Sequence, residues 1–189
     1  MIESDKMLIK KIDDSEFKNF TSICDCIIKI LDALKPLHEK GFLHLNISPD
    51  TLYFSDTGIV SLMDNTCAFR VGDDLQNKKP SFKAGYSASE LFHSPYTKPL
   101  TLHYAADLYS VTAIFFRLLV GRAPKEGDWS NSSQWELNNK TECLKDASDL
   151  LVQMINEFLR KGLSLVAARR FEDVEEMREE IKKLKRRGA

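Results

Sequence analysis

Several side chains that could take part in chemistry lie between residues 44 and 64: His44, Asn46, Ser48, Thr51 and Asp64. An asparagine amide is neutral, so Asn46 cannot act as a general base. Asp64 is a weak metal-ligand candidate, because Mg²⁺ is held by carboxylates together with phosphates and a lone carboxylate is a poor site. We interpret His44 as a buried structural histidine, and Asp64 also fits a simple turn acid. These residues alone predict no complete catalytic set.

The residues before this stretch predict a long amphipathic helix. Their apolar side chains recur every three or four positions, as in a helix laid on a core. The stripe consists of Ile23, Ile27, Ile30, Leu31, Leu34 and Leu37. Residues 13–15 offer capping side chains at its start, and Gly41 ends it. Pro36 lies in the last turns, where a missing backbone donor should bend the helix.

A small hairpin and a long loop are predicted next. Residues 52–54 and 59–63 are mostly apolar and flank the turn sequence at 55–58, which favours strand, turn and strand. Residues 64–89 are polar and contain glycines and a proline, so we expect a loop there. Loops of that length inside a compact domain are usually functional or mobile.

The segment that follows predicts a helix in the middle of the domain. Residues 104–120 are apolar on nearly all sides, and a helix of that kind is buried, with Gly121 closing it. Residues 125–146 are polar, with Trp129 and Trp135 as isolated apolar anchors. We expect a loop and a short helix in this region.

Two more helices complete the prediction. Apolar pairs repeat every four residues from Ser148, a candidate cap, to Gly162, a candidate end. The last helix has its buried stripe between residues 171 and 184. The predicted fold class is therefore mainly α (α+β), a single domain over residues 1–189 with one small β-hairpin.

Composition excludes several classes of function. The chain has 189 residues, of which 43% are hydrophobic and 29% charged, as in ordinary globular proteins. Its 27 Lys and Arg residues nearly balance 28 Asp and Glu residues, so no overall field favours nucleic acid or a membrane surface. The basic run at 182–187 fits a helix C-terminus, where cations favour the dipole.

Targeting and cysteine usage predict a cytoplasmic protein. The first residues lack the apolar core of a signal peptide, and the longest apolar run, 108–120, is interrupted by Arg117. We therefore expect no membrane span. Four cysteines show no metal-ligand spacing, and we expect free, mostly buried thiols in a reducing compartment. They are Cys24, Cys26, Cys67 and Cys143.

Six segments resemble, in order and spacing, motifs of the protein kinase C-terminal lobe. The run from Leu37 to Phe54 resembles the catalytic loop and the helix before it. Residues 62–66 stand in place of Asp-Phe-Gly, and residues 85–90 stand in place of the end of the activation segment. Residues 107–110 and 118–124 resemble the two ends of the central helix, and the sixth segment is 170–177. The last segment resembles the closing segment of bacterial serine/threonine kinases. The resemblance covers about residues 12–186 and implies a kinase C-lobe fold.

The ATP-gripping lobe of that family has no counterpart in this sequence. The 189 residues contain no G-x-G-x-x-G and no V-A-I-K-like stretch, and Met1 stands close to where the hinge would be. We expect the N-lobe to be absent. No cofactor is then expected, and ATP with Mg²⁺ would bind only if a second lobe were supplied. An absent lobe would also expose the cleft floor, including Leu52 and Phe54, and such a patch calls for a protein partner or self-association.

The resemblance assigns the chemically important positions, and most are changed. Asn46 stands at the catalytic aspartate, Ser48 at the loop lysine, and Thr51 at the asparagine that holds a second magnesium. Leu45 replaces the arginine that pairs with a phosphorylated activation loop. Asp64 keeps a metal-binding identity, but Asn65 and Thr66 replace the Phe and Gly after it.

The architectural positions are kept. By resemblance, His44 packs under the catalytic loop and Asp107 holds the loop backbone by hydrogen bonds. Glu90 and Arg170 would form a buried ion pair between the activation segment and the last helices. A kept scaffold with lost chemistry is the pattern of a pseudokinase.

Three functions remain open at this point. The first is a catalytically inactive, kinase-like module that binds proteins, using the loop at 65–89 and the region of Trp129 and Trp135. The second is a fragment or split half of a serine/threonine kinase, active when an N-lobe is supplied. The third is a decaying gene product with a fold and no selected role.

Overall fold

The fold is described from a computed structural model. It describes residues 6–13, 16–55, 57–64, 69–73, 80–93, 102–125, 137 and 141–188. Several residues used in the predictions above lie outside this part of the chain: Asp14, Ser15, Asn65, Thr66, Cys67, Trp129 and Trp135. Much of the expected loop at 64–89 also lies outside it.

The long predicted helix is present but begins later than expected. Helix α2 spans Phe20–Glu39, and Asn19 caps it by accepting a hydrogen bond from the Ser22 backbone N–H at 2.8 Å. The predicted start at residues 13–15 was wrong, because the earlier residues form a separate short helix, α1, at Leu8–Asp13. At the other end, Gly41 takes a left-handed conformation (φ 76°) and its N–H bonds to the carbonyl of His38.

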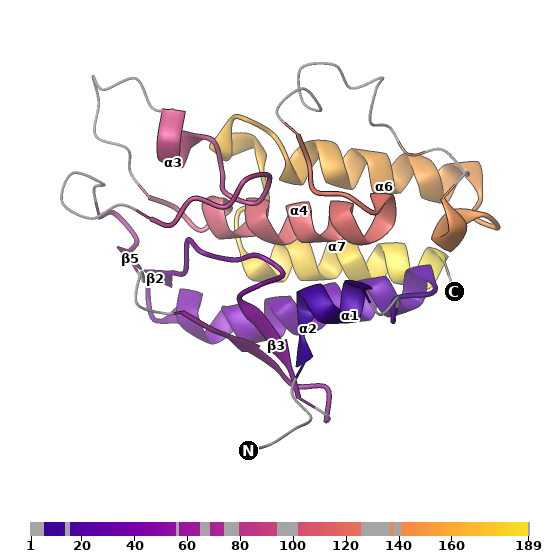
Figure 1. The fold of residues 1–189 in the computed structure, drawn as a ribbon. Coiled ribbons are helices and arrows are strands. Elements are labelled where there is room, and N and C mark those ends of the chain that lie inside the picture. The colour runs from indigo at the N-terminus through magenta and orange to yellow at the C-terminus, as the bar shows by residue number, and fades with distance from the viewer. Residues whose placement is uncertain are drawn as a thin grey trace.

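The buried central helix is confirmed. Helix α4 spans Ala105–Val120 and is followed by Gly121 with φ 83°. It contacts α2 on one side and, on the other, α6 at Asp149–Gly162, while α7 at Val174–Arg187 packs against both α2 and α6 (Figure 1). Most of the buried residues of α4 belong to the hydrophobic core that these helices share.

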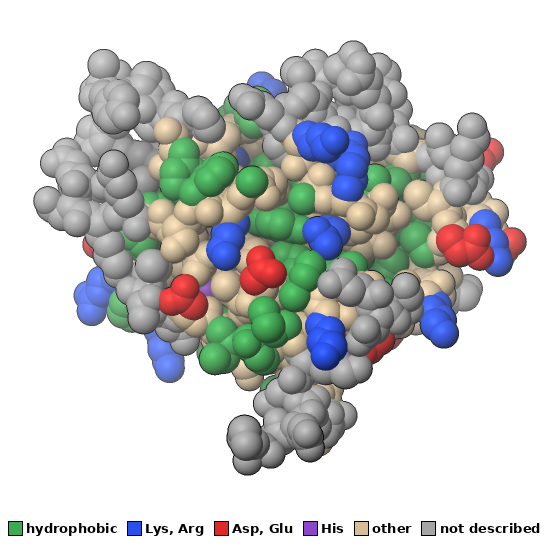
Figure 2. Space-filling view, viewed as in Figure 1, with side chains coloured by type: hydrophobic (Ala, Val, Ile, Leu, Met, Phe, Trp, Pro, Cys, Tyr) green, Lys and Arg blue, Asp and Glu red, His purple; other side chains and the backbone are tan. Residues whose placement is uncertain are grey.

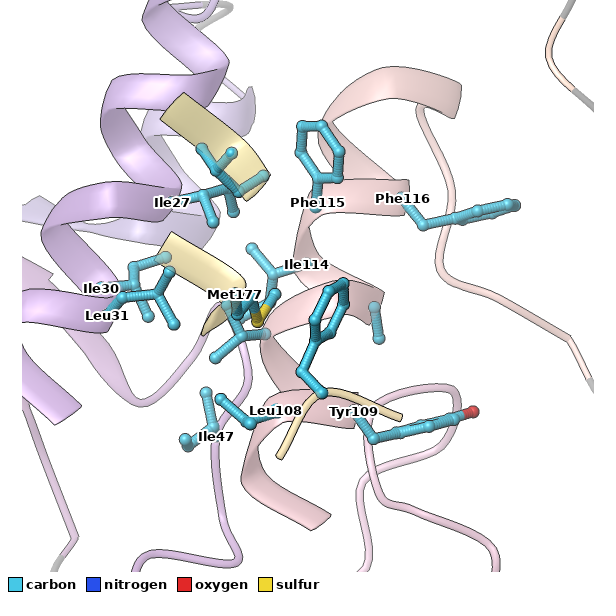
Figure 3. Packing of buried hydrophobic residues seen from close by; sticks show 14 of the residues in the cluster. Ile27, Ile30, Leu31, Ile47, Leu108, Tyr109, Ile114, Phe115, Phe116 and Met177 are labelled. Carbon is cyan, nitrogen blue, oxygen red and sulfur yellow. The ribbon is translucent and has the colours of Figure 1, made fainter. Parts of the chain in front are cut away.

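Close packing between α2 and α4 forms the centre of the core. Figure 3 shows Ile27 and Ile30 of α2 facing Ile114 of α4, with Met177 of α7 between the two helices. All four side chains are fully buried. Burial of this kind is the main source of stability in the fold.

Helix α6 begins and ends where predicted, but its last glycine is there for a different reason. Ser148 caps the helix as expected and accepts from the Leu151 N–H. Gly162, however, is the last helical residue and has no left-handed conformation; a Cβ added there would stand 2.2 Å from Oγ1 of Thr112. Its glycine is explained by the close approach of α6 to α4 and not by a cap.

The sheet content is larger than the predicted single hairpin. Strands β3 (Leu52–Phe54) and β4 (Val60–Leu62) form that hairpin, and β1 (Lys6–Met7) adds a third antiparallel strand in the order β1-β3-β4. A separate pair joins β2 (Phe42–Leu43) to β5 (Phe69–Arg70). The three strands that the sequence missed have two residues each, which is too short to show a pattern.

Three single-turn elements connect the larger ones. They are α3 at Glu90–His93, η3 at Glu142–Leu144 and η4 at Ala167–Arg169. Within the described part of the chain, no helix combines the length and apolar character needed to cross a bilayer.

The prediction that Leu52 and Phe54 lie exposed is wrong. Leu52 is fully buried and Phe54 is 5% exposed. The reason is the N-terminal segment: β1 pairs with β3, α1 lies against the same strand, and the Lys11 ammonium stands 5.7 Å from the centre of the Phe54 ring. The surface that the sequence left uncovered is therefore covered by residues of this same chain.

The described cysteines are free thiols, as expected. Cys24 and Cys26 are buried and Cys143 is partly buried. Burial raises the pKa of Cys24 to about 12 and also raises the pKa of Cys26. Since the thiolate is the reactive form, these two side chains are inert at neutral pH.

Candidate functional site

Asp107, at the start of α4, holds the loop that connects β2 to β3. Its Oδ2 accepts from the backbone N–H of His44 at 2.8 Å, and its Oδ1 accepts from that of Leu45 at 2.8 Å. Leu45 has φ 55°, a left-handed conformation that side chains other than glycine rarely adopt. A fully buried carboxylate thus stabilises a strained backbone at this end of the loop.

A second contact to Asp107 comes from His38, whose role the sequence analysis missed. Its Nε2 lies 2.9 Å from Oδ2 of Asp107, and its ring stacks on Tyr104 with centroids 4.5 Å apart. The Tyr104 hydroxyl donates in turn to the carbonyl of His38. The sequence offered one signal: His38 follows Leu34 by four residues and so continues the buried face of α2.

Asn46 lies in the same loop, and its amide contacts Asp64. The Nδ2 group donates to Oδ2 of Asp64 at 2.8 Å, while the Oδ1 atom of this 2%-exposed side chain is buried without a hydrogen-bond partner. The backbone N–H of Asn46 donates to Nδ1 of the fully buried His44 at 3.3 Å. Asp64 itself is exposed and has φ 63°.

The hydroxyl of Thr51 is used inside the loop. Its Oγ1 donates to the carbonyl of Asn46 at 2.7 Å and lies 3.1 Å from that of Ser48, and it accepts from the Ser48 N–H at 3.0 Å. Ser48 is fully buried, and its Oγ has no hydrogen-bond partner. Both hydroxyls therefore point into the protein and away from solvent.

Glu90 and Arg170 form a two-pronged ion pair at the edge of this region. Nη1 and Nη2 of Arg170 lie 2.6 and 2.7 Å from Oε1 and Oε2 of Glu90. The other donors of Arg170 reach the carbonyls of Ser164 and Ala105, and its guanidinium stands 4.9 Å from the Tyr109 ring centre. This arginine, 4% exposed, thus donates from all three of its nitrogens within the protein.

The arrangement limits what the site can do chemically. Asp64 is the only carboxylate among the five polar residues that the sequence singled out first, and the Asn46 amide already binds one of its oxygens. Across the described residues, no three His, Cys, Asp or Glu side chains lie close enough together to hold a metal ion. Hydrogen bonds fix the backbone of the loop, but its described side chains do not place a general base beside a group of metal ligands.

Comparison with known proteins places this loop in context. The chain is 25% identical over 167 residues to a probable protein kinase of Dictyostelium discoideum, which covers 85% of this chain and 43% of that protein. It is 20% identical over 161 residues to a probable serine/threonine-protein kinase of Clostridium perfringens, covering 84% of this chain and 23% of the relative. The chain is a distant homologue of serine/threonine protein kinases.

A third relative, the probable serine/threonine-protein kinase PknB of Bifidobacterium longum, is 30% identical over 108 residues, or 55% of this chain and 15% of its own length. The chain thus spans less than half the length of these curated relatives. No protein-family model matches it. The relatives come from bacteria and from Dictyostelium, so a bacterial origin stays a prediction.

Proposed function

We propose that this kinase homologue is catalytically inactive and acts as a protein-interaction module, in the manner of a pseudokinase. The contact between the Asn46 amide and the Asp64 carboxylate, at 2.8 Å, carries the proposal. Phosphoryl transfer by a kinase needs an acceptor for the substrate's hydroxyl proton beside a metal-binding carboxylate. Here the corresponding side chain is a hydrogen-bond donor, and it binds one oxygen of the carboxylate that a metal would need.

The two hydroxyl residues of the loop support the same conclusion. At Ser48 a kinase would place a cation near the transferred phosphate, and a buried serine supplies no charge. At Thr51 the only side-chain oxygen is already engaged with the backbone of the loop. The Ser48 hydroxyl is buried and uncharged, and the Thr51 hydroxyl is already hydrogen-bonded, so neither offers a group suited to binding magnesium or phosphate.

The structural contacts of Glu90, Arg170 and Asp107 support a binding role. The ion pair of Glu90 with Arg170 and the contacts of Asp107 organise a defined surface without contributing a reactive group. Large apolar side chains stand on that surface, including Phe82 at 60% exposure and Met63 at 47%. We infer that a protein partner, or a second copy of this chain, contacts it, and that nucleotide is not a cofactor.

Thermal unfolding with and without millimolar Mg-ATP tests the proposal. A ligand at about 100 times its Kd stabilises a protein by about 2.7 kcal/mol, which for this size is a shift in Tm of roughly 5–11 °C. We expect no shift for the natural chain and none for an Asp64→Asn control. A shift of that size in the natural chain that disappears in Asp64→Asn would overturn the proposal.

One observation favours a second candidate, a kinase half that needs another lobe. The relatives are described as probable kinases, and the chain spans 43% or less of the three compared here. Phosphate transfer from radiolabelled ATP to a general protein substrate would be measured with the chain alone and with the remaining kinase region of the Dictyostelium relative added. Transfer that requires both polypeptides would establish the second candidate, and its absence would support the first.

A further inference from the structure

Arg117 is a cation in the core helix, and none of the described residues supplies an anion to pair with it. Its Nη1 donates to the hydroxyl of Tyr86 at 3.2 Å, and its Nε is buried without any acceptor. Among the described residues, no carboxylate lies within ion-pair distance of this guanidinium. A partly buried charge in this condition is costly to keep, since burying charged groups stabilises only when they are paired.

Tyr86 does not neutralise that charge. Burial raises the pKa of Tyr86, although the neighbouring Arg117 acts in the opposite direction. The phenol is therefore protonated at neutral pH. Its oxygen accepts from Arg117, while its own O–H proton remains available to donate to another acceptor.

The backbone around Tyr86 is fixed against α4. The hydroxyl of Ser110 donates to the Tyr86 carbonyl at 2.7 Å. The preceding residue, Gly85, has φ 79°, and a Cβ there would stand 2.6 Å from the carbonyl oxygen of Pro124. These contacts fix the backbone that carries Tyr86, which lowers the entropy lost when a ligand binds to its side chain.

The surroundings combine positive charge with exposed apolar surface. Lys83 lies in the same turn, partly exposed, and Phe82 presents an exposed ring packed edge-on against Phe92. Figure 2 shows, on the face that it draws, basic side chains on both sides of a central apolar strip with acidic groups close by. Asp50, which is exposed, is the carboxylate whose charge reaches Tyr86.

We propose that Arg117 and Tyr86 form a binding site for an acidic polypeptide segment of a protein partner. The oxyanion, a carboxylate or a phosphoryl group, accepts from the guanidinium and from the Tyr86 hydroxyl, and apolar residues beside it pack on Phe82. Arginine suits this role because its planar fork binds such oxygens in pairs. The inference rests on the proposed function, for which it names the chemistry of the partner.

Binding of short fluorescent peptides, followed by anisotropy, tests the site. The peptides share an uncharged frame with leucines and differ in one central residue, which is glutamate, phosphoserine, glutamine or lysine. We expect the glutamate or phosphoserine peptide to bind at least about tenfold more tightly than the glutamine peptide, because charge-assisted hydrogen bonds contribute more than neutral ones. The order of glutamate and phosphoserine identifies which anion the site takes.

Variants then assign the effect to Arg117. Arg117→Gln should remove the preference for the anionic peptide, while Arg186→Gln, an equal loss of charge at an exposed position near the end of α7, should leave it unchanged. Asp50→Asn changes only an exposed side chain and should tighten anionic binding by about two- to fivefold. This last variant keeps the test valid if Arg117→Gln does not fold, as judged by circular dichroism.

Two results would overturn the inference: equal binding by the Arg117→Gln and Arg186→Gln proteins, or unchanged binding in Asp50→Asn. A preference for the lysine peptide would overturn it as well. None of these results bears on phosphate transfer, which is measured separately. Activity with Mg-ATP would overturn the proposed function while leaving the anion preference of Arg117 intact.

Discussion

The two ends of helix α4 treat their charged side chains in opposite ways. At the start, Asp107 accepts from two backbone N–H groups and contacts His38, so both of its oxygens are in use. Near the other end, Arg117 makes one contact at 3.2 Å with a neutral hydroxyl and keeps a buried Nε without an acceptor. The carboxylate at the start is fully hydrogen-bonded within the protein, whereas the guanidinium near the other end has no anionic partner among the described residues.

The same contrast separates the support of the loop from the loop's own side chains. Below the loop, both oxygens of Asp107 accept hydrogen bonds and Arg170 is paired with Glu90. Within it, the Asn46 amide oxygen and the Ser48 hydroxyl are buried without partners. A well-bonded support and unsatisfied side chains in the loop thus occur side by side.

The largest effect that this comparison predicts is at Asp107. Asp107→Ala removes the acceptor of the His44 and Leu45 N–H groups and releases the strained Leu45, so we expect a loss of about 5 kcal/mol in the free energy of unfolding. Urea denaturation measures it. Because such a loss can unfold a small domain outright, Asp107→Asn serves as a milder variant with an intermediate loss. Wild-type stability in both variants would show that Asp107 is not the support of the loop.

The ion pair between Glu90 and Arg170 predicts the next largest effect. Breaking a buried pair on one side leaves an unpaired charge and costs about 3–5 kcal/mol. Arg170→Ala should cost more than Glu90→Ala, because Arg170 also binds the Ser164 and Ala105 carbonyls. Melting temperatures of the two variants, compared with that of Asn46→Ala, measure this. Equal melting temperatures for all three variants would show that the ion pair does not stabilise the fold.

Much of the scaffold could be predicted from the sequence, because its elements have long patterns. The stripe of α2 and the apolar run of α4 each extend over several turns, and their ends at Gly41 and Gly121 follow from glycine's freedom at positive φ. The start of α2 could not be placed, since residues 13–15 and Asn19 are equally good capping types. Only the fold decides which of them is used.

Contacts between residues that are far apart in the sequence could not be predicted from it. The burial of Leu52 and Phe54 by β1 needs a pairing between segments more than forty residues apart, and no local pattern announces it. Gly162 was read as a cap, although a neighbour, Thr112, explains it. For the site, residue types alone identified Asn46 as unable to act as a base, whereas its contact with Asp64 required the structure.

A smaller effect is expected inside the loop, at Thr51. Thr51→Val keeps the shape of the side chain and removes the hydroxyl that bonds to the loop backbone at Asn46 and Ser48, so we expect a loss of about 1–3 kcal/mol in unfolding free energy. Thr57→Val is the matched control, because the Thr57 hydroxyl is exposed and bonds only to Ser55. If both variants lose the same unfolding free energy, the Thr51 hydroxyl does not stabilise the loop.

The smallest effect should be at Asn46, although this side chain is as buried as many core residues. Its amide makes one side-chain hydrogen bond, to the exposed Asp64, and removing it also removes an oxygen without a partner. Asn46→Ala should therefore cost less than about 1 kcal/mol in unfolding free energy. Asn156→Ala is the matched control, because that amide bonds twice to the backbone of Leu137 and its loss should cost about 2–3 kcal/mol.

Urea denaturation of the two asparagine variants, made in parallel, separates two explanations of Asn46. A small loss relative to Asn156→Ala means that the position is free of structural demand, so its neutral amide reflects the loss of a base and not the needs of the fold. A loss as large as that of Asn156→Ala would make Asn46 part of the scaffold. Asn46, on which the proposed inactivity rests, would then be a structural residue like Asp107, and the contrast between the two would no longer hold.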